Sequence, residues 1–553
     1  MIKKIGLAVV IPLFLIGVYY LTQQDAQEPS SPKPDSPQQK ENADSGQPNA
    51  SIDEIFSLAA KGEVPGHSFT AGKTKIDSVT KKWGSYNETV QTNNGQYVEF
   101  PDRNVHFGIQ NGTVFDVRLF DSGLSAIHYK EIKELKGKPD KTHVYKDETH
   151  QQIILVYKVS ADYRLKWIVP KPTDTESNPA VDHISVVTSN NYQLEKQVET
   201  LTLDEKIGQM IFAGISGTTA GEQTKKLIGK YKVGGIILYA ANMETPEQTV
   251  ALLNKIKQLN EQNTSPVLLG VDQEGGVVSR LPGELTDIPP NSKLGTVNDP
   301  GYSHKIGFLL GKMVKEYGFN LDFAPVMDVN SNPDNPVIGN RAFSNNPEVV
   351  SNLGIQTMKG IQSKNVIPVI KHFPGHGDTS VDSHLQLPTV NKSKAALRKL
   401  ELIPFKDAIQ HGADVIMVAH ILLPKIDEDY PSSMSKPVIT GMLREHLQYE
   451  GVIISDDMTM QAITDNYKIG GAAVKSVKAG TDIIMVAHDY GKVTTVINAL
   501  KQAVQSGEIP EKRIDQSVKR IIRLKQKYHL PHDQTDPVNV DQLNHSIQKV
   551  LRE

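Results

Sequence analysis

The stretch from Lys371 to Asp378, KHFPGHGD, is the densest group of reactive side chains in the sequence, and Asp382 and His384 follow it closely. Histidine titrates near neutral pH, so it suits general acid–base work, and a nearby aspartate can orient its ring. Histidine and aspartate also bind divalent metals. Proline and glycine in the stretch disfavour a helix and permit tight turns. We therefore expect a loop that carries an acid–base pair or a metal site.

Other polar residues follow short apolar runs elsewhere in the chain. They are Asp272, Gln273, Glu274 and Arg280; Asp328 and Arg341; His420; Asp456 and Asp457; and His488. Charged groups that converge at one place are costly unless they are paired or used, so this pattern indicates a functional site. Asp456 and Asp457 are adjacent at the end of a run, so they are expected to point in opposite directions.

Eight apolar runs precede these residues, with helical patterns between them. The runs are 211–215, 235–239, 267–271, 321–326, 366–370, 414–419, 452–454 and 483–486. Continuous apolar strands that alternate with helices predict parallel pairing, and eight such units predict an α/β fold of the (β/α)₈ barrel type. Active sites of such barrels lie at the carboxyl ends of the strands, where the polar residues fall.

The barrel domain is expected to span 195–531, followed by a tail at 532–553. Thr202 and Glu205 have the spacing of a capping box in front of an apolar helix face, which marks a domain start. At the other end of the chain, Lys3 and Lys4 precede an apolar run, so 1–21 is predicted to be a signal peptide or a membrane anchor. The polar segment 22–51 is predicted to be a disordered linker. The remainder is expected to lie outside the cytoplasm, at the cell surface or in the cell wall.

Residues 52–190 are predicted to form a small α+β module built from a tandem repeat. A helical pattern that ends at Gly84 recurs before Gly137, and strand-like segments follow each copy. The module is similar to the β-lactamase-inhibitor-like group of bacterial modules, and we expect it to bind or to act as a spacer. The aromatic residues Trp83, Phe100, Phe107 and Trp167 favour core packing over a binding platform.

Composition excludes several classes of function. Lys and Arg total 60 against 63 for Asp and Glu, so nucleic acid is not expected as the main partner. The chain has no cysteine, which excludes disulfides, thiol nucleophiles and thiolate metal sites. No cofactor is expected.

The barrel region resembles glycoside hydrolase family 3, in its bacterial β-N-acetylglucosaminidase branch. The resemblance covers residues 201–530 and lies in VDQEGG at 271–276, NPVIGNRAF at 335–343, KHFPGHGD at 371–378, DSH at 382–384 and SDDM at 455–458. It implies Asp456 as the nucleophile, His384 as the acid/base and Asp382 as its partner. It also implies five residues that hold the amino sugar, namely Asp272, Arg280, Arg341, Lys371 and His372.

These roles imply a retaining exo-β-N-acetylglucosaminidase that acts through a covalent glycosyl-enzyme on peptidoglycan fragments, muropeptides or related amino-sugar glycans. Three alternatives remain at this point. The histidines and aspartates of the 372–384 segment are also compatible with a metal-dependent barrel hydrolase. A neutral histidine as acid/base also suits an N-acetylglucosaminide phosphorylase, because it does not repel phosphate. The third alternative is a non-catalytic surface glycan-binding protein.

Overall fold

The structure is a computed structural model that describes residues 50–92, 95–110, 112–146, 151–383, 385–530 and 533–552. The chain divides into two compact units, 1–196 and 197–553. The predicted signal or anchor at 1–21 and nearly all of the predicted linker lie outside the described residues. No helix in the described ranges is both long and apolar enough to cross a membrane.

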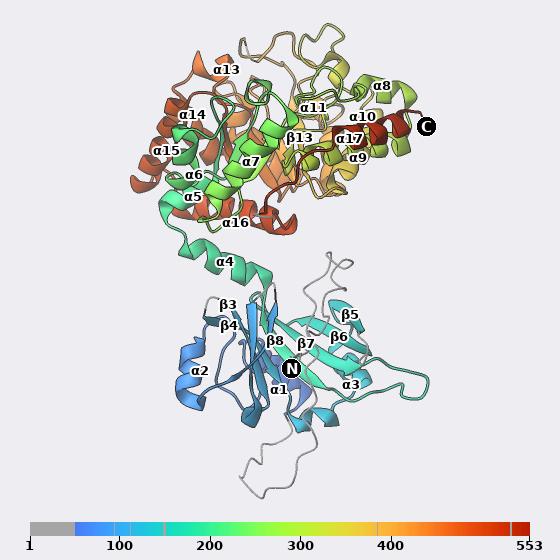
Figure 1. Ribbon diagram of the computed structural model, residues 1–553, viewed down its shortest axis with the longest axis vertical. Helices are drawn as coiled ribbons and strands as arrows, with labels where there is room; N and C mark the ends of the chain where they lie inside the picture. The colour runs from blue at the N-terminus through green and yellow to red at the C-terminus, as the bar shows by residue number, and fades with distance from the viewer. Residues whose placement is uncertain are drawn as a thin grey trace, which may run out of the picture. The chain divides into compact units, whose positions relative to one another are not determined.

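The first unit is an antiparallel eight-stranded sheet with three helices against it (Figure 1). The strand order is β1-β2-β3-β4-β8-β7-β6-β5, so β4 and β8 join two sets of four strands at the centre. The strands are β1 (Asn87–Thr92), β2 (Gly95–Phe100), β3 (Val105–Gln110), β4 (Thr113–Leu119), β5 (Lys141–Lys146), β6 (Gln151–Lys158), β7 (Tyr163–Pro170) and β8 (His183–Thr188). The helices are α1 (Ile52–Ala59), α2 (Ile76–Trp83) and α3 (Tyr129–Lys136).

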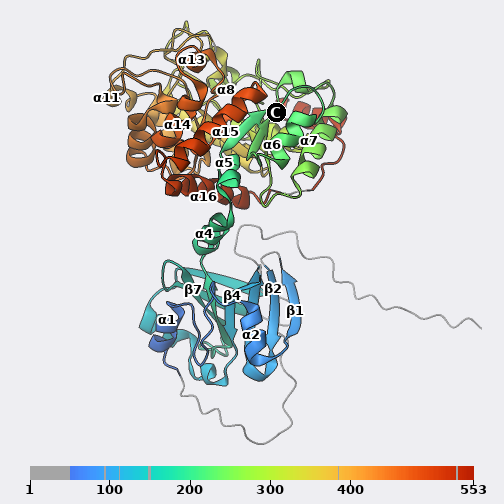
Figure 2. The ribbon, with the colours of Figure 1, turned by 90° about the vertical axis from the view of Figure 1, so that its left-hand side faces the viewer.

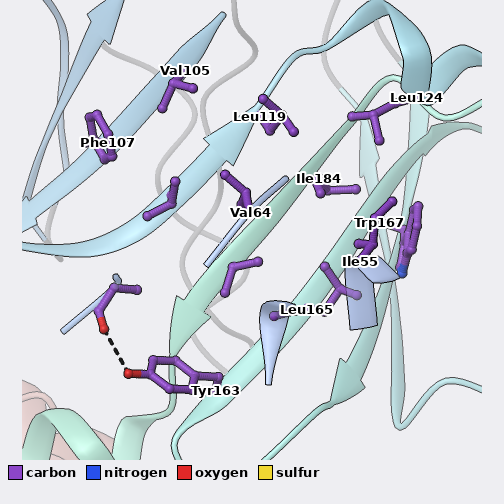
Figure 3. Packing of buried hydrophobic residues seen from close by; sticks show 14 of the residues in the cluster. Ile55, Val64, Val105, Phe107, Leu119, Leu124, Tyr163, Leu165, Trp167 and Ile184 are labelled. Atoms are coloured by element: carbon purple, nitrogen blue, oxygen red, sulfur yellow. Dashed lines mark hydrogen bonds between the residues drawn. The ribbon is translucent and has the colours of Figure 1, made fainter. Parts of the chain in front are cut away.

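The helices pack on one face of this sheet and share its apolar core (Figure 3). Trp167, Phe107 and Phe100 are at most 3% exposed, which confirms the core interpretation of these three aromatic side chains. Trp83 is half-buried and packs edge-on against Phe100. Tyr163 reaches across the core, where its hydroxyl donates to the Ala71 carbonyl oxygen (3.0 Å; Figure 3).

The second unit contains the parallel barrel that the eight apolar runs predict. Its strands are β9 (Ile211–Gly214), β10 (Gly235–Ile237), β11 (Leu268–Val271), β12 (Leu321–Asp322), β13 (Ile367–Phe373), β14 (Val415–Val418), β15 (Val452–Ser455) and β16 (Ile484–Val486). They pair in chain order, and β16 returns to β9. A single parallel bridge between Ile454 and Ile483 nearly closes the ring.

Helices surround the barrel, as both views show (Figures 1 and 2). They are α5 (Leu203–Gln209), α6 (Glu222–Gly229), α7 (Pro246–Asn260), α8 (Asn291–Val297), α9 (Pro300–Glu316), α10 (Pro347–Gln362), α11 (Lys394–Leu397), α12 (Leu402–Gln410), the π-helix Pro437–His446, α13 (Gln461–Thr464), α14 (Ile469–Ala479), α15 (Tyr490–Gln505), α16 (Glu511–Lys527) and α17 (Val540–Leu551). A further helix, α4 (Asn190–Thr200), contains the boundary between the units. The predicted capping box is present, because Thr202 and Glu205 exchange hydrogen bonds at the start of α5.

Two strands differ most from their predicted runs at the carboxyl end. β12 ends at Asp322 rather than at Val326, and beyond it Pro325 has no N–H to donate to a ladder. β13 continues to Phe373, so Lys371 and His372 lie within a strand rather than after it. Both differences occur at the carboxyl end of the barrel, where the polar residues gather.

The predicted C-terminal tail contains α17, which packs on α9. Leu543 and Ile547 are fully buried in this contact. Asn544 binds the main chain of a barrel loop, accepting from Thr286 N and donating to the Glu284 oxygen, both at 2.7 Å. The helix therefore fixes the end of the segment that follows β11.

Candidate active site

A cavity of about 400 Å³ opens at the carboxyl ends of the barrel strands. Of the eight site residues predicted from sequence, six line it: Asp272, Arg280, Arg341, Lys371, His372 and Asp456. Asp382 is half-buried and is not among the lining residues, although Ser383 and Leu385 on either side of position 384 are. His384 lies outside the described residues. The fold thus brings together side chains that are up to 184 positions apart in sequence, between Asp272 and Asp456.

One wall of the cavity is a network of two carboxylates and two cations. Lys371 Nζ lies 2.6 Å from Asp272 Oδ1 and 2.7 Å from Glu274 Oε1. Arg341 binds both oxygens of Glu274, through Nη2 at 2.7 Å and Nε at 2.9 Å. Glu274 and Lys371 are almost completely buried, at 1% and 3% exposure of their side chains. The charges balance, so no buried charge is left without an opposite charge beside it. The network therefore holds its N–H donors and carboxylate acceptors rigidly at the cavity wall.

The pKa values follow from these contacts. Burial alone would raise the pKa of Glu274, but Lys371 and Arg341 outweigh it and hold that pKa well below its ordinary value. Burial would likewise lower the pKa of Lys371, yet the carboxylates of Asp272 and Glu274 raise it. Glu274 and Lys371 therefore both stay charged at neutral pH.

Beneath this wall, Asp322 on β12 is fully buried. Its Oδ1 accepts from Gln273 N (3.0 Å), while Oδ2 has no partner among the described residues. Burial raises the pKa of Asp322 well above its ordinary value, which favours the neutral acid. Asp322 fixes the main chain next to Asp272 through the hydrogen bond that it accepts from Gln273 N.

A second cluster holds the two histidines of the KHFPGHGD stretch. Asp328, fully buried, lies 2.7 Å from His372 Nδ1 and accepts from His376 N, also at 2.7 Å. Burial, aided by His372, lowers the pKa of His376 to about 4, so this ring is neutral at pH 7. Its two nitrogens lie at hydrogen-bond distance from hydroxyls of Thr379 (2.7 Å) and Ser383 (3.3 Å).

Ser383 connects this cluster to the predicted acid–base loop. It is 2% exposed, and its carbonyl oxygen accepts from Ala462 N in α13. The carbonyl oxygen of Asp382 accepts from Leu385 N and Gln386 N. The loop is therefore held at both His376 and α13.

Asp456 and Asp457 follow β15 and have different surroundings. Asp457 N donates to Asp456 Oδ1 (2.8 Å), and the half-buried Asp456 lines the cavity. Asp457 Oδ1 accepts from Thr459 N and Ala487 N, both at 2.9 Å, so its carboxylate joins β15 to the end of β16. Asp457 is thus a structural acceptor, whereas Asp456 can approach a substrate.

Three further side chains complete the description of the strand ends. The Arg280 guanidinium makes no hydrogen bond or ion pair with any residue that the structure describes, so it can bind an incoming ligand. His488 stacks on Tyr239 in the cavity wall, with ring centroids 4.9 Å apart. His420 is fully buried between Ser433 and Asp457 and does not line the cavity.

Sequence reasoning assigned no roles to Glu274, Asp328 and Tyr239. Glu274 and Asp328 each follow a barrel strand in the sequence, which is a usable signal, but their partners Arg341 and His372 are 67 and 44 positions away. In the sequence, Tyr239 is only the last residue of the apolar run 235–239, which does not indicate a place in a binding site. Burial and the carboxylates of Asp457, Asp272 and Asp456 raise its pKa far above 10, so it stays a neutral phenol.

The metal alternative has little support in this geometry. Within the described ranges, no three His, Asp or Glu side chains form a group that could hold a metal ion. His372 is bound to Asp328, and both ring nitrogens of His376 are engaged by hydroxyls. A metal at this place would require these hydrogen bonds to break.

A parallel barrel that places the half-buried Asp456 carboxylate beside a charge-balanced network at its strand ends is the arrangement of a barrel glycosidase. The family model described as "Glycosyl hydrolase family 3 N terminal domain" matches residues 202–524, and the chain belongs to this family. Residues 52–187 match a domain of unknown function, DUF4309.

Similar proteins with curated names include β-hexosaminidases. The chain is 34% identical over 334 residues to Beta-hexosaminidase A of Pseudoalteromonas piscicida, covering 56% of either chain, and thus spans about half of that relative. It is 34% identical over 319 residues to the Beta-hexosaminidase of Nitrosomonas eutropha, with 56% of this chain and 90% of the relative covered. The solved family 3 β-N-acetylglucosaminidase of Paenibacillus sp. str. FPU-7 is similar at 39% identity and a TM-score of 0.61, covering 64% of this chain and 68% of that one.

Proposed function

We propose that the chain is a β-N-acetylhexosaminidase that removes terminal β-linked N-acetylglucosamine with retention of configuration. The position of Asp456 carries this proposal, because it is a half-exposed carboxylate in the cavity of a family 3 barrel. The hydrogen bond from Asp457 N fixes one oxygen of Asp456, and the Asp456 carboxylate attacks the anomeric carbon. The names of the relatives support the N-acetylamino sugar as substrate.

The other residues have roles that follow from their contacts. His384 donates a proton to the leaving oxygen and later takes one from water, and Asp382 orients its ring. Lys371 and Asp272 present a donor and an acceptor to the sugar hydroxyls from a rigid wall. Arg280 contributes a guanidinium with no protein partner among the described residues.

We also propose that the protein acts outside the cytoplasm on peptidoglycan fragments. The apolar run at 1–21 and the polar linker at 22–51 support export and tethering to the membrane. Two sets of four strands that meet at β4 and β8 support a tandem repeat in the first unit. This unit binds a ligand or acts as a spacer. Cell fractionation tests the location, and recovery of the protein in the cytoplasm would contradict it.

The activity is tested with 4-nitrophenyl N-acetyl-β-glucosaminide and the full chain. We expect release of nitrophenol with or without chelator, and its loss in Asp456→Ala and His384→Ala. Asp536→Ala, which removes an exposed carboxylate elsewhere, serves as the matched control and should match the intact protein. Inactivation by chelator would favour a metal hydrolase, and formation of sugar 1-phosphate in phosphate buffer would favour a phosphorylase.

A further inference from the structure

A second cavity, of about 720 Å³, lies on the outside of the barrel along α14 and α15. These two helices pack side by side, as Figures 1 and 2 show. Tyr430 and Met434 from the segment after β14 form one wall, and Asn466 and Tyr467 after α13 form another. None of these residues lines the catalytic cavity. The second cavity is therefore a separate surface feature, and the reaction described above leaves it without a role.

Two stacked aromatic rings lie in this second cavity. The rings of Tyr430 and Tyr467 have centroids 6.2 Å apart and planes inclined by 29°. Tyr467 is fixed at its far end, since its hydroxyl donates to the Asp429 carbonyl oxygen (3.0 Å). Lys475 Nζ lies 3.8 Å from the centre of the Tyr430 ring, which is cation–π distance. Fixed aromatic faces of this kind can bind the apolar side of a ligand at low entropic cost.

The lining of the second cavity contains more lysines than carboxylates, although Asp427 and Asp429 lie close to Tyr467. Three lysines line it, namely Lys468, Lys475 and Lys478. Lys478 is paired with Glu508 at 2.9 Å. In the part of the chain that the structure describes, Lys468 and Lys475 have no carboxylate partner. Two free ammonium groups beside aromatic rings favour an anionic ligand with carboxylate groups.

A short piece of chain connects the two cavities. Gln461, the first residue of α13, lines the catalytic cavity, and Tyr467 lines the second one. Six residues of chain span at most about 20 Å, even when fully extended. A leaving group of one amino sugar with a short peptide has a comparable length, so one substrate can reach both cavities.

We propose that the second cavity binds the leaving-group side of the substrate, as a subsite for a carboxylate-bearing peptide attached to the amino sugar. The inference rests on the proposed function and deepens it by placing the peptide part of an anionic glycopeptide in a cavity on the outside of the barrel. Lys468 and Lys475 pair with the peptide carboxylates, and the tyrosine rings pack against its apolar parts. Small neutral substrates end before this subsite and do not use it.

The test compares three substrates with the full chain: the nitrophenyl glycoside, chitobiose, and N-acetylglucosaminyl-N-acetylmuramic acid carrying an alanine–glutamate dipeptide. The double variant Lys468→Gln/Lys475→Gln should lower kcat/KM for the glycopeptide by about three- to tenfold, the size expected for two exposed ion pairs. Values for the two neutral substrates should stay unchanged. High salt should shrink the difference between the intact protein and the variant.

Lys512→Gln is the matched control, because Lys512 is an exposed lysine on α16, away from both cavities. It should behave as the intact protein with all three substrates. An unchanged glycopeptide rate in the double variant, or an equal loss with chitobiose, would overturn the subsite. If the intact protein releases no nitrophenol, the proposed function itself fails, which is a different result.

Discussion

Replacing Glu274 with glutamine tests whether charge balance in the cavity wall holds the site together. Glutamine keeps the shape but removes the charge that binds Lys371 at 2.7 Å and both donors of Arg341. Lys371 would then keep only its ion pair with Asp272, and Arg341 would lose its direct carboxylate partner. Removing one partner of a buried ion pair costs about 3–5 kcal/mol, because the remaining charge is left uncompensated. At about 2 °C per kcal/mol for a domain of this size, Tm should fall by roughly 6–10 °C.

The same substitution should also lower the catalytic efficiency. Displacement of Lys371 and Arg341 by about 1 Å would lower kcat/KM for the nitrophenyl glycoside by about 10²-fold. Circular dichroism at increasing temperature measures Tm, and nitrophenol release measures kcat/KM. The control is Glu450→Gln, an exposed glutamate whose loss should change stability by less than about 0.5 kcal/mol. A Glu274→Gln protein with the Tm of the intact chain and kcat/KM within threefold would refute the charge-balance argument.

Three further substitutions follow from the same structure. The raised pKa of Asp322 means that folding becomes less favourable as pH rises above its unfolded value near 4, so Asp322→Asn should gain Tm relative to the intact chain between pH 5 and 8 in thermal melts. Burial lowers the pKa of Lys525 to about 7, so above that pH the unfolded chain binds more protons than the folded one. The Tm of the intact chain should therefore rise from pH 7 to 9 relative to that of Lys525→Met. A Tm difference between the two proteins that does not change with pH would contradict this. A Cβ at Gly377 would lie 1.9 Å from the Val329 oxygen, so Gly377→Ala should cost about 1–3 kcal/mol in urea unfolding, whereas Gly229→Ala, with open space around it, should be neutral or stabilising.

The strands of the barrel were predictable because their sequences are apolar without interruption. A parallel strand covered on both faces needs such a run, and all eight predicted runs overlap a strand. The ends of the strands were less predictable. β12 already ends at Asp322, whereas pairing of Phe373 with Val418 extends β13 past Lys371 and His372, which lie at a register shift. Polarity of a side chain therefore does not mark the end of a strand.

The residues of the cavity were recognisable from position and resemblance, but their pairings were not. Glu274 and Arg341 come from segments after different strands, and only the closed ring brings them together. The same is true of Asp328 and His372. The pKa values depend on these pairings, since Asp322 and Glu274 are both buried carboxyl groups. Direct ion pairs with Lys371 and Arg341 hold the pKa of Glu274 low, whereas burial outweighs the attraction of Lys371 at Asp322 and raises its pKa.

The contact between α17 and the loop at 284–286 bears on how this glycosidase unit can be moved or trimmed. The family match ends at residue 524, so a gene fragment cut there would encode every strand of the barrel and every lining residue of the catalytic cavity. It would lack Asn544, which binds the loop at 284–286, and Leu543 and Ile547, which pack on α9. Such a fragment would expose the apolar surface of α9 that α17 covers, and this surface would favour self-association. The loop at 284–286 would also lose its contacts with Asn544. A fusion protein should therefore keep α17 and join its new partner after Leu551, so that Asn544 still binds the loop at 284–286.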